Sequence, residues 1–549
     1  MQNLHCKHIG KCGGCTINAP YNAQLKSKKQ YILSLFSDEL AKSNFTPKDL
    51  EVFASPPTHY RARAEFRIFR ENVAIITKQT QDQTNSPYTP QNKKPTITLA
   101  MMGKDNEHKK AIKIPIKSCP ILLPNISVTL SSFVDFINDL ALCHNKEDFE
   151  ILSHKLYAIE ALGIINPPKN TAPKSNQNLS VILTLIYHKK LESKWEKTIT
   201  NLAQKLPPNI AIIGRSKHQK IILQTDSLLE SITLTNLQKT PFKNANQNTK
   251  KYDINKQQHL IFLRSEGRFS QPNAFINPQM ISFVKSAIFK HSKEDLLEMY
   301  CGEGNFCVSL ARDFRKVLAT EVVKSAIPAL QINAKNNGIE NITALRLSGE
   351  ESIEALEGKR EFFRAREVDL RSFRFSHILI DPPRSGISGS EISGDGISGS
   401  EISGGGINKN EISESGDSTN YVSEICKNVV RKNAISGGEI SKSEIARSEI
   451  SKESINESKT NKIHTSQHNP KHQQDTNISN ASNTHKQRAL KMLDFIATHR
   501  YIIYISCNPL SLKKDLEILL KNHKITHFAL FDQFPHTHHI ESALILEKR

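Results

Sequence analysis

The stretch from Asp295 to Phe306, DLLEMYCGEGNF, carries the clearest fold signal in this chain of 549 residues. Its apolar start is typical of a buried strand, its two glycines of a turn, and the following VSLARDF of a helix. Gly302 and Gly304 would let the backbone approach a ligand closely, which a side chain would block. The next apolar run, VLAT, ends in Glu321, where a Rossmann-like unit uses an acidic side chain to bind ribose hydroxyls. The order predicts a nucleotide-type α/β domain.

The same glycine pattern limits the cofactor. A Gly-x-Gly turn alone often reflects helix packing, but the acidic residue at this distance favours an adenosyl site. Phe306 and Cys307 follow Asn305 where a full GxGxxG motif would continue, which argues against a pyrophosphate cradle. The pattern therefore favours S-adenosylmethionine over NAD.

Three further polar residues stand at the ends of apolar strands. SHILI ends in Asp381, within DPPRSG, and YIIYIS delivers Cys507, within SCNP. THFALFDQF and HIESALILEK read as a final antiparallel hairpin, with Glu541 at the start of its second strand. Because open α/β sheets bind ligands at the carboxyl ends of their strands, Asp381 and Cys507 are expected on one edge.

A cysteine and a carboxylate at this edge suit one particular chemistry. Carbon 5 of uracil becomes nucleophilic only after a thiolate adds to carbon 6, and a base must later remove the proton from carbon 5. Taken alone, Cys507 is more simply a packing residue and Glu541 a solvated one. With a cofactor loop and Asp-Pro-Pro, the two form the set that this reaction needs.

The motifs SCNP, DPPRSG, FSQPN, LLEMYCGEGNF, VLATE and FDQFPHTHHIES resemble those of the RNA 5-methyluridine methyltransferase family. The likeness extends through SPPTHYRARAEFRIF, IYHKKLESKW, IGRSKHQKIIL and REFFRAREVDL. Within the family the chain is most similar to the tRNA branch, because HTHHIE differs from the HTGHxE of the rRNA branches. The resemblance implies S-adenosylmethionine-dependent methylation of a tRNA uridine (T-loop, position 54) through a covalent cysteine–uracil adduct.

The resemblance also assigns roles to residues. It implies that Cys507 is the nucleophile and Glu541 the proton acceptor. The residues that it places in contact with S-adenosylmethionine are Gln271, Tyr300, Asn305, Glu321 and Asp381.

Four cysteines suggest a metal site. Cys6, Cys12 and Cys15 have metal-ligand spacing, and Cys119 in KSCP can complete a set of four. This spacing suits zinc or an iron–sulfur cluster and cannot choose between them. The pattern resembles the [4Fe-4S] site of the rRNA enzymes of the same family, which implies a structural cluster.

The bulk composition suggests an intracellular partner of opposite charge. The net charge is +19, which favours a polyanion such as nucleic acid. The chain shows no secretory signal and no apolar run long enough for a membrane span. We expect a cytoplasmic protein that binds tRNA, with another structured RNA as the alternative, and that binds neither membrane nor DNA. A DNA cytosine methylase is disfavoured because its nucleophile normally follows a Pro-Cys loop.

A low-complexity segment interrupts the chain at residues 387–486. Isoleucine recurs there every five residues, from Ile387 to Ile412 and from Ile435 to Ile450, among Ser, Gly, Glu, Asn and Lys. A folded repeat is an alternative, but one isoleucine in five buries too little to offset chain entropy, so disorder is expected. The segment holds 11 basic and 13 acidic residues, so the rest of the chain carries a surplus of 21 positive charges.

The predicted fold class is therefore α/β: a Rossmann-like methyltransferase domain, an N-terminal α+β RNA-binding region and a disordered insert. The expected parts are a cysteine segment (1–19), an RNA-binding region (20–285), the methyltransferase domain (286–386 and 487–549) and the insert (387–486). Two other functions stay open, a 23S rRNA 5-methyluridine methyltransferase and a tRNA-folding chaperone. The few residues before Cys6 leave no room for the β-barrel that often precedes the cluster in rRNA enzymes, which favours tRNA.

Overall fold

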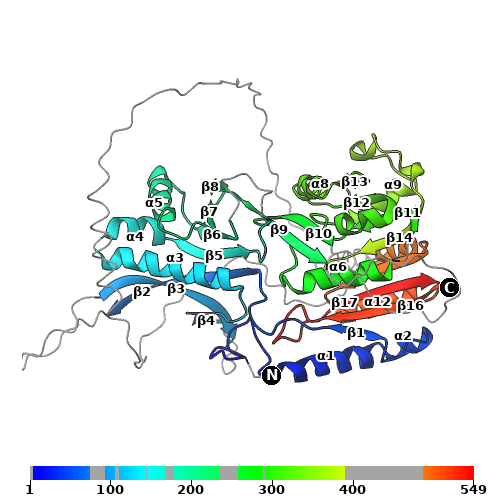
Figure 1. Cartoon of the computed structure of the whole chain (residues 1–549), viewed down its shortest axis with the longest axis horizontal. Helices are drawn as coiled ribbons and strands as arrows, with labels where there is room; N and C mark the ends of the chain where they lie inside the picture. Colours follow the sequence, from blue (N-terminus) through cyan, green and yellow to red (C-terminus); the bar gives the residue numbers. More distant parts are fainter. Residues whose placement is uncertain are drawn as a thin grey trace, which may run out of the picture. The chain divides into compact units, whose positions relative to one another are not determined.

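The computed structural model describes residues 4–74, 93–104, 111–143, 145–168, 179–234, 258–288, 291–389 and 486–549 (Figure 1). By its internal contacts the chain divides into residues 1–391 with 483–549, and residues 392–482. The second unit, and with it nearly all of the predicted insert, lies outside the described residues. No helix in the described ranges is long and apolar enough to cross a membrane.

An eight-stranded, mostly parallel sheet forms the core of the predicted α/β domain. Its last two strands, β16 and β17, are an antiparallel hairpin, and β17 also pairs antiparallel with β15. The predicted final hairpin is confirmed, although β1 adds a further parallel strand beside β16. In sheet order the strands are β1 (Leu50–Phe53), β16 (His523–Phe531), β17 (Glu541–Lys548), β15 (Tyr501–Ser506), β14 (Phe375–Ile380), β11 (His291–Met299), β12 (Phe314–Thr320) and β13 (Ile342–Leu345).

Helices cover both faces of this sheet because its strands are apolar on both sides. Adjacent strand residues point to opposite faces of the sheet, so Leu296 and Leu297 belong to two separate hydrophobic clusters. One cluster includes α6 (Ile276–Ala287), α7 (Cys307–Leu310), α8 (Ala326–Asn336) and the β9–β10 hairpin (Ser227–Leu234, Gln258–Ser265). The other includes α1 (Tyr21–Leu35), α2 (Ser37–Lys42), α9 (Gly349–Leu356), the helical residues 486–496 and α12 (Pro509–Leu519).

A second sheet, of seven strands, is formed by residues between 63 and 222 and has its own hydrophobic core. It is antiparallel except for the β6–β7 pair, whose strands are connected through a helix. Three helices, α3 (Pro124–Leu142), α4 (Lys146–Ser153) and α5 (Ser193–Ala203), contribute to its hydrophobic core. In sheet order the strands are β4 (Ala111–Pro115), β3 (Lys93–Lys104), β2 (Arg63–Ala74), β5 (Leu156–Gly163), β6 (Val181–Tyr187), β7 (Ile210–Ser216) and β8 (Gln219–Ile222).

The expected RNA-binding region, residues 20–285, is divided between the two sheets. Its beginning, α1 to β1, and its end, β9 to α6, join the core of the eight-stranded sheet. The cause is apolar packing, since Ile32 and Phe36 are fully buried there. The start of the predicted insert also differs, because Ile387 is buried in the core and its N–H donates to Asp515.

Candidate functional site

The cofactor turn follows β11 as the sequence predicts. Tyr300, Gly302 and Gly304 have φ angles of 63°, 53° and 87°, in the left-handed region that glycine tolerates best. A Cβ atom on Gly304 would lie 2.9 Å from Leu330 Cγ, so this glycine also allows close packing. Glu321, just after β12, accepts a hydrogen bond from the Gly302 N–H at 3.0 Å. The acid and the turn are therefore fixed to each other.

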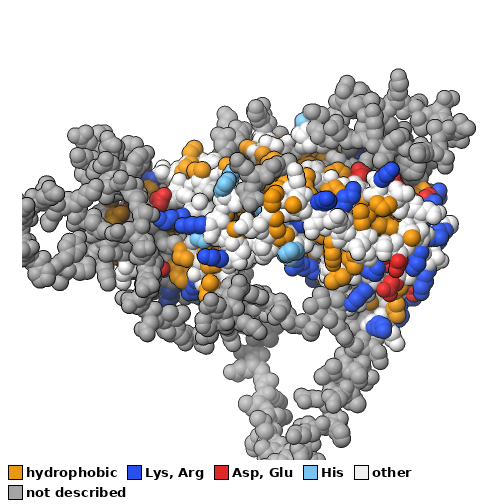
Figure 2. Space-filling view, turned by 90° about the horizontal axis from the view of Figure 1, so that it is seen from below, with side chains coloured by type: hydrophobic (Ala, Val, Ile, Leu, Met, Phe, Trp, Pro, Cys, Tyr) orange, Lys and Arg blue, Asp and Glu red, His pale blue; other side chains and the backbone are white. Residues whose placement is uncertain are grey.

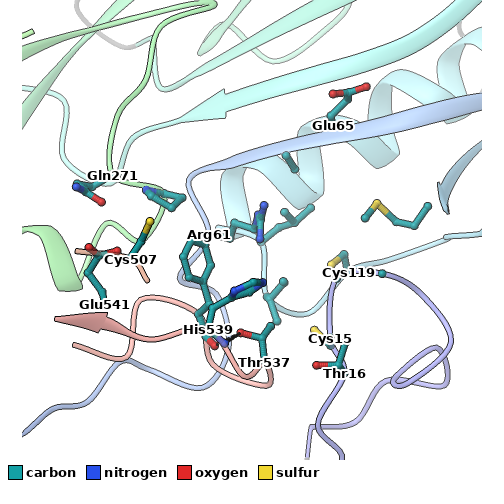
Figure 3. A pocket seen from close by; sticks show the side chains of 18 of the residues that line it. Cys15, Thr16, Arg61, Glu65, Cys119, Gln271, Cys507, Thr537, His539 and Glu541 are labelled. Atoms are coloured by element: carbon teal, nitrogen blue, oxygen red, sulfur yellow. Dashed lines mark hydrogen bonds between the residues drawn. The ribbon is translucent and has the colours of Figure 1, made fainter. Parts of the chain in front are cut away.

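Asp381, Cys507 and Glu541 meet at one edge of the eight-stranded sheet. Asp381 follows β14 and Cys507 follows its parallel neighbour β15, so both carboxyl ends lie together. Strand β17 runs antiparallel beside β15, pairing Ser506 with Ser542, which brings Glu541 next to Cys507. All three side chains line one cavity of about 1030 Å³, the central cavity. Cys507 and Glu541 lie side by side in it, near Gln271 (Figure 3).

The protonation of this group is set mainly by burial. Burial, followed by the charges of Glu541 and Asp381, raises the pKa of Cys507 to about 11. Burial also raises the pKa of Glu541 well above its usual range and that of Asp381 to about 7. Cys507 is therefore a thiol at neutral pH in the absence of ligands. A cation bound in the cavity would favour the thiolate and both carboxylates.

The structure brings together four of the five predicted cofactor residues. Gln271, Tyr300, Glu321 and Asp381 line the central cavity. Asn305 is not among the residues that line it. Its amide is engaged with the amide of Asn277 on α6 through hydrogen bonds of 3.0 and 2.8 Å.

The four predicted metal-ligand cysteines line another part of the same cavity. Burial, followed by the charges of Cys119, Cys12 and Cys6, raises the pKa of Cys15 to about 12. Because these charges act on Cys15, the four thiols are neighbours. We call them the thiol group. Thr537, His539 and Arg61 lie between Cys15 and Cys119 on one side and Cys507 on the other (Figure 3). Across the ranges listed above for the structure, no three His, Cys, Asp or Glu side chains are arranged to hold a single metal ion.

A column of stacked side chains marks the seven-stranded sheet. The guanidinium carbon of Arg67 on β2 lies 4.1 Å from the centre of the Tyr157 ring on β5. That ring stacks on His188, just after β6, with ring centres 4.1 Å apart and planes tilted by 23°. Tyr157 is 40% exposed although it lies in a strand. We call these three residues the stacked column.

Sequence reasoning missed several residues of the site. Phe269, in FSQPN, lines the cavity yet is 74% exposed, as a ring at its mouth would be. Gln533, in FDQF, donates a hydrogen bond of 2.5 Å to Gln271. Arg384, in DPPRSG, lies 2.7 Å from His539 Nδ1. All three stand inside motifs that resemble those of the family, and this membership is the signal that could have identified them. Of the stacked column, Arg67 and His188 also stand inside such motifs, whereas Tyr157 does not.

Comparison with known proteins gives consistent matches. The family model described as tRNA (Uracil-5-)-methyltransferase matches residues 20–98, 134–393 and 487–549. A tRNA/tmRNA (uracil-C(5))-methyltransferase of Helicobacter hepaticus is 33% identical, with 99% of both chains covered. One of Wolinella succinogenes is 30% identical with the same coverage. The solved structure of Pyrococcus abyssi tRNA (uracil-54, C5)-methyltransferase with S-adenosyl-L-homocysteine is 14% identical, with a TM-score of 0.48, covering 96% of this chain and 84% of that one. The thiol group lies outside the residues that the family model matches.

Proposed function

Because this chain belongs to the tRNA (uracil-5-)-methyltransferase family, we propose that it methylates carbon 5 of a uridine in tRNA, with S-adenosylmethionine as donor. The observation that carries the proposal is the meeting of Cys507, Glu541 and Asp381 in one cavity beside the glycine turn. Two related proteins are named for both tRNA and tmRNA, so we propose tmRNA as a second substrate.

The reaction assigns one step to each group. The Cys507 sulfur adds to carbon 6 of a uracil turned into the cavity, and the ring electrons move onto carbon 5 and oxygen 4. S-adenosylmethionine would supply an electrophilic methyl group, which carbon 5 takes up. Glu541 then removes the proton from carbon 5, the ring double bond forms again, and the Cys507 thiolate leaves. The raised pKa of Glu541 suits a group that must hold this proton.

The residues around the turn fit the cofactor. The carboxylate of Glu321 stands where ribose hydroxyls bind in Rossmann-like folds, and the backbone at Gly302 is open to a ligand. Gln271, Tyr300 and Asp381 would complete the pocket. We propose that Asn305 acts by fixing α6 through Asn277, or reaches the ligand only after that pair separates.

We propose that tRNA binds on the seven-stranded sheet, a narrower region than residues 20–285. The stacked column offers a cation and two rings, the combination on which nucleic-acid bases stack. The positive charge of the chain supports a phosphate-rich partner. On the face shown in Figure 2, Lys and Arg side chains are scattered and not gathered in one stripe.

Replacement of Tyr157 by alanine is expected to weaken tRNA binding about tenfold or more, because stacking contributes about 1–3 kcal/mol per base. The rate at saturating tRNA should change little, since Tyr157 does not line the central cavity. Binding is measured by filter retention at fixed salt. Tyr31→Ala is the matched control, because Tyr31 is exposed to a similar degree, 46%. Equal losses in both variants would contradict the assignment.

We propose that the thiol group holds a structural [4Fe-4S] cluster, with zinc as the alternative. The donor set fits, because four neighbouring thiols suit iron–sulfur or zinc ligation. Thiolates ligate both groups, so the donor set alone leaves the cluster and zinc open, and metal analysis distinguishes them.

Protein purified without oxygen is expected to be brown and to contain about four irons per chain. Cys15→Ser should lower the iron content, because it removes the most buried of the four ligands. Cys143→Ser, at an exposed cysteine outside the group, should leave it unchanged. The measurement is iron and zinc analysis together with the absorption spectrum. A colourless protein loaded with zinc would refute the cluster.

The proposed function is tested with unmodified transcripts. The protein and S-adenosylmethionine are incubated with tRNA, tmRNA and 23S rRNA transcripts, and 5-methyluridine is measured by mass spectrometry. We expect the nucleoside in tRNA and tmRNA. Methylation of 23S rRNA alone would favour the rRNA alternative. The chaperone function would be favoured by two results together. The wild type would methylate none of the transcripts, and the Cys507→Ala protein would still restore tRNA folding.

A further inference from the structure

The loop of residues 532–540, which joins β16 to β17 and leads directly into Glu541, is held by the N-terminal part of the chain. Tyr60 donates its hydroxyl to the carbonyl of Pro535 at 3.1 Å. The N–H groups of Thr16 and Ile17 donate to the carbonyl of His536 at 2.8 and 3.0 Å. The conformation of a loop beside the reacting atoms therefore depends on residues about 500 positions earlier.

Helix α1 contributes a buried ion pair to this support. Lys28 Nζ lies 2.7 Å from Asp532 Oδ1, and the two side chains are 5% and 0% exposed. The same Nζ donates to the carbonyl of Phe534 at 3.1 Å. A lysine is rarely buried without such partners. The buried ammonium group of Lys28 therefore binds the loop and holds it in place.

One turn earlier, Gln24 holds the most constrained residue of the loop. His536 has a φ of 65°, which is unfavourable for a residue with a Cβ atom and persists only where the surroundings fix it. Its N–H donates to Gln24 Oε1 at 2.8 Å, and its Nδ1 lies 3.1 Å from Gln24 Nε2. Its Nε2 lies 2.8 Å from the carbonyl of Pro57. A carbonyl only accepts, so Nε2 carries the proton and Nδ1 accepts from Gln24.

We propose that Gln24 and Lys28 are positioning residues for the proton acceptor Glu541, which makes helix α1 a part of the catalytic apparatus. The inference rests on the proposed function. Neither residue lines the central cavity, so both act through the loop. The step that depends on them is the last one. Glu541 takes the proton from carbon 5, the C–H electrons form the ring double bond, and the bond from carbon 6 to the Cys507 sulfur breaks with its electrons on sulfur.

The test separates this last step from the earlier ones. Gln24→Met and Lys28→Met proteins are mixed with tRNA and methyl-labelled S-adenosylmethionine in a single turnover, and methylated RNA still bound to protein is measured on denaturing gels. We expect this adduct to accumulate and to decay at least tenfold more slowly than in the wild type. With tRNA containing 5-fluorouridine, which has no proton on carbon 5, both variants should be trapped as fast as the wild type. Lys26→Met, at an exposed lysine of the same helix, is the matched control.

Each outcome decides the inference. Release of product by both variants at the wild-type rate would overturn it. Loss of 5-fluorouridine trapping would also overturn it, because the whole site would then have failed. Lys28→Met leaves the Asp532 carboxylate without its cation. The Lys28→Met/Asp532→Asn and Gln24→Met proteins contain no such unpaired charge and serve as controls for a fold defect. Thermal unfolding measures whether any variant has such a defect. A wild-type protein that is neither trapped nor active would refute the proposed function itself.

Discussion

A Cys507→Ala protein is expected to lose tRNA methylation by a factor on the order of 10⁴ or more, since loss of a nucleophile removes the covalent route entirely. Carbon 5 of uracil does not take a methyl group at a useful rate without addition at carbon 6. The same variant should form no covalent species with tRNA that contains 5-fluorouridine. Methylation is measured with the transcript assay, and the covalent species is measured on denaturing gels.

The matched control for this substitution is Cys143→Ala. Cys143 is exposed, caps the end of α3 and does not line the central cavity. The Cys143→Ala protein should methylate tRNA and form the covalent species with 5-fluorouridine-containing tRNA as the wild type does. S-adenosylmethionine binding by the Cys507→Ala protein should persist, because the glycine turn and Glu321 are untouched. A Cys507→Ala protein with normal turnover would refute the covalent mechanism.

A Glu541→Gln protein is expected to lose turnover by about 10²- to 10⁴-fold, the usual contribution of a positioned general base. Its adduct chemistry should survive, because Cys507 and the cofactor pocket are intact. The amide has the same shape as the acid but does not take the proton from carbon 5. Methylated RNA should therefore remain attached to Cys507, which mass spectrometry of the protein–RNA species would detect.

The control for Glu541 lies on the same strand. Glu547→Gln changes a partly exposed acid that pairs with Lys524 at the far end of β17, so turnover should be normal. An effect of equal size in both variants would indicate a strand defect and not a lost base. Fast release of product by Glu541→Gln would assign the base to another group, and Asp381 would be the first to examine.

Local sequence patterns predicted which polar residues meet at one edge of the eight-stranded sheet. Asp381 and Cys507 each follow an apolar strand, and parallel strands place their carboxyl ends together. Apolar runs, glycine turns and a terminal hairpin are local signals, so they are readable from one chain without a structure. Glu321 was found in the same way, from its distance to the glycines.

The pairing of polar groups from distant segments became visible only in the folded chain. Lys28 meets Asp532 across 504 positions and Gln24 meets His536 across 512, and neither pair has a local pattern. The structure likewise turned Asn305 toward Asn277 and placed the thiol group in the cavity that holds Cys507. Periodicity predicts which face of an element is apolar, but the partner of a buried lysine or amide depends on how whole elements pack. For that reason the sequence predicted which residues meet at the sheet edge, and the fold alone revealed what holds them in place.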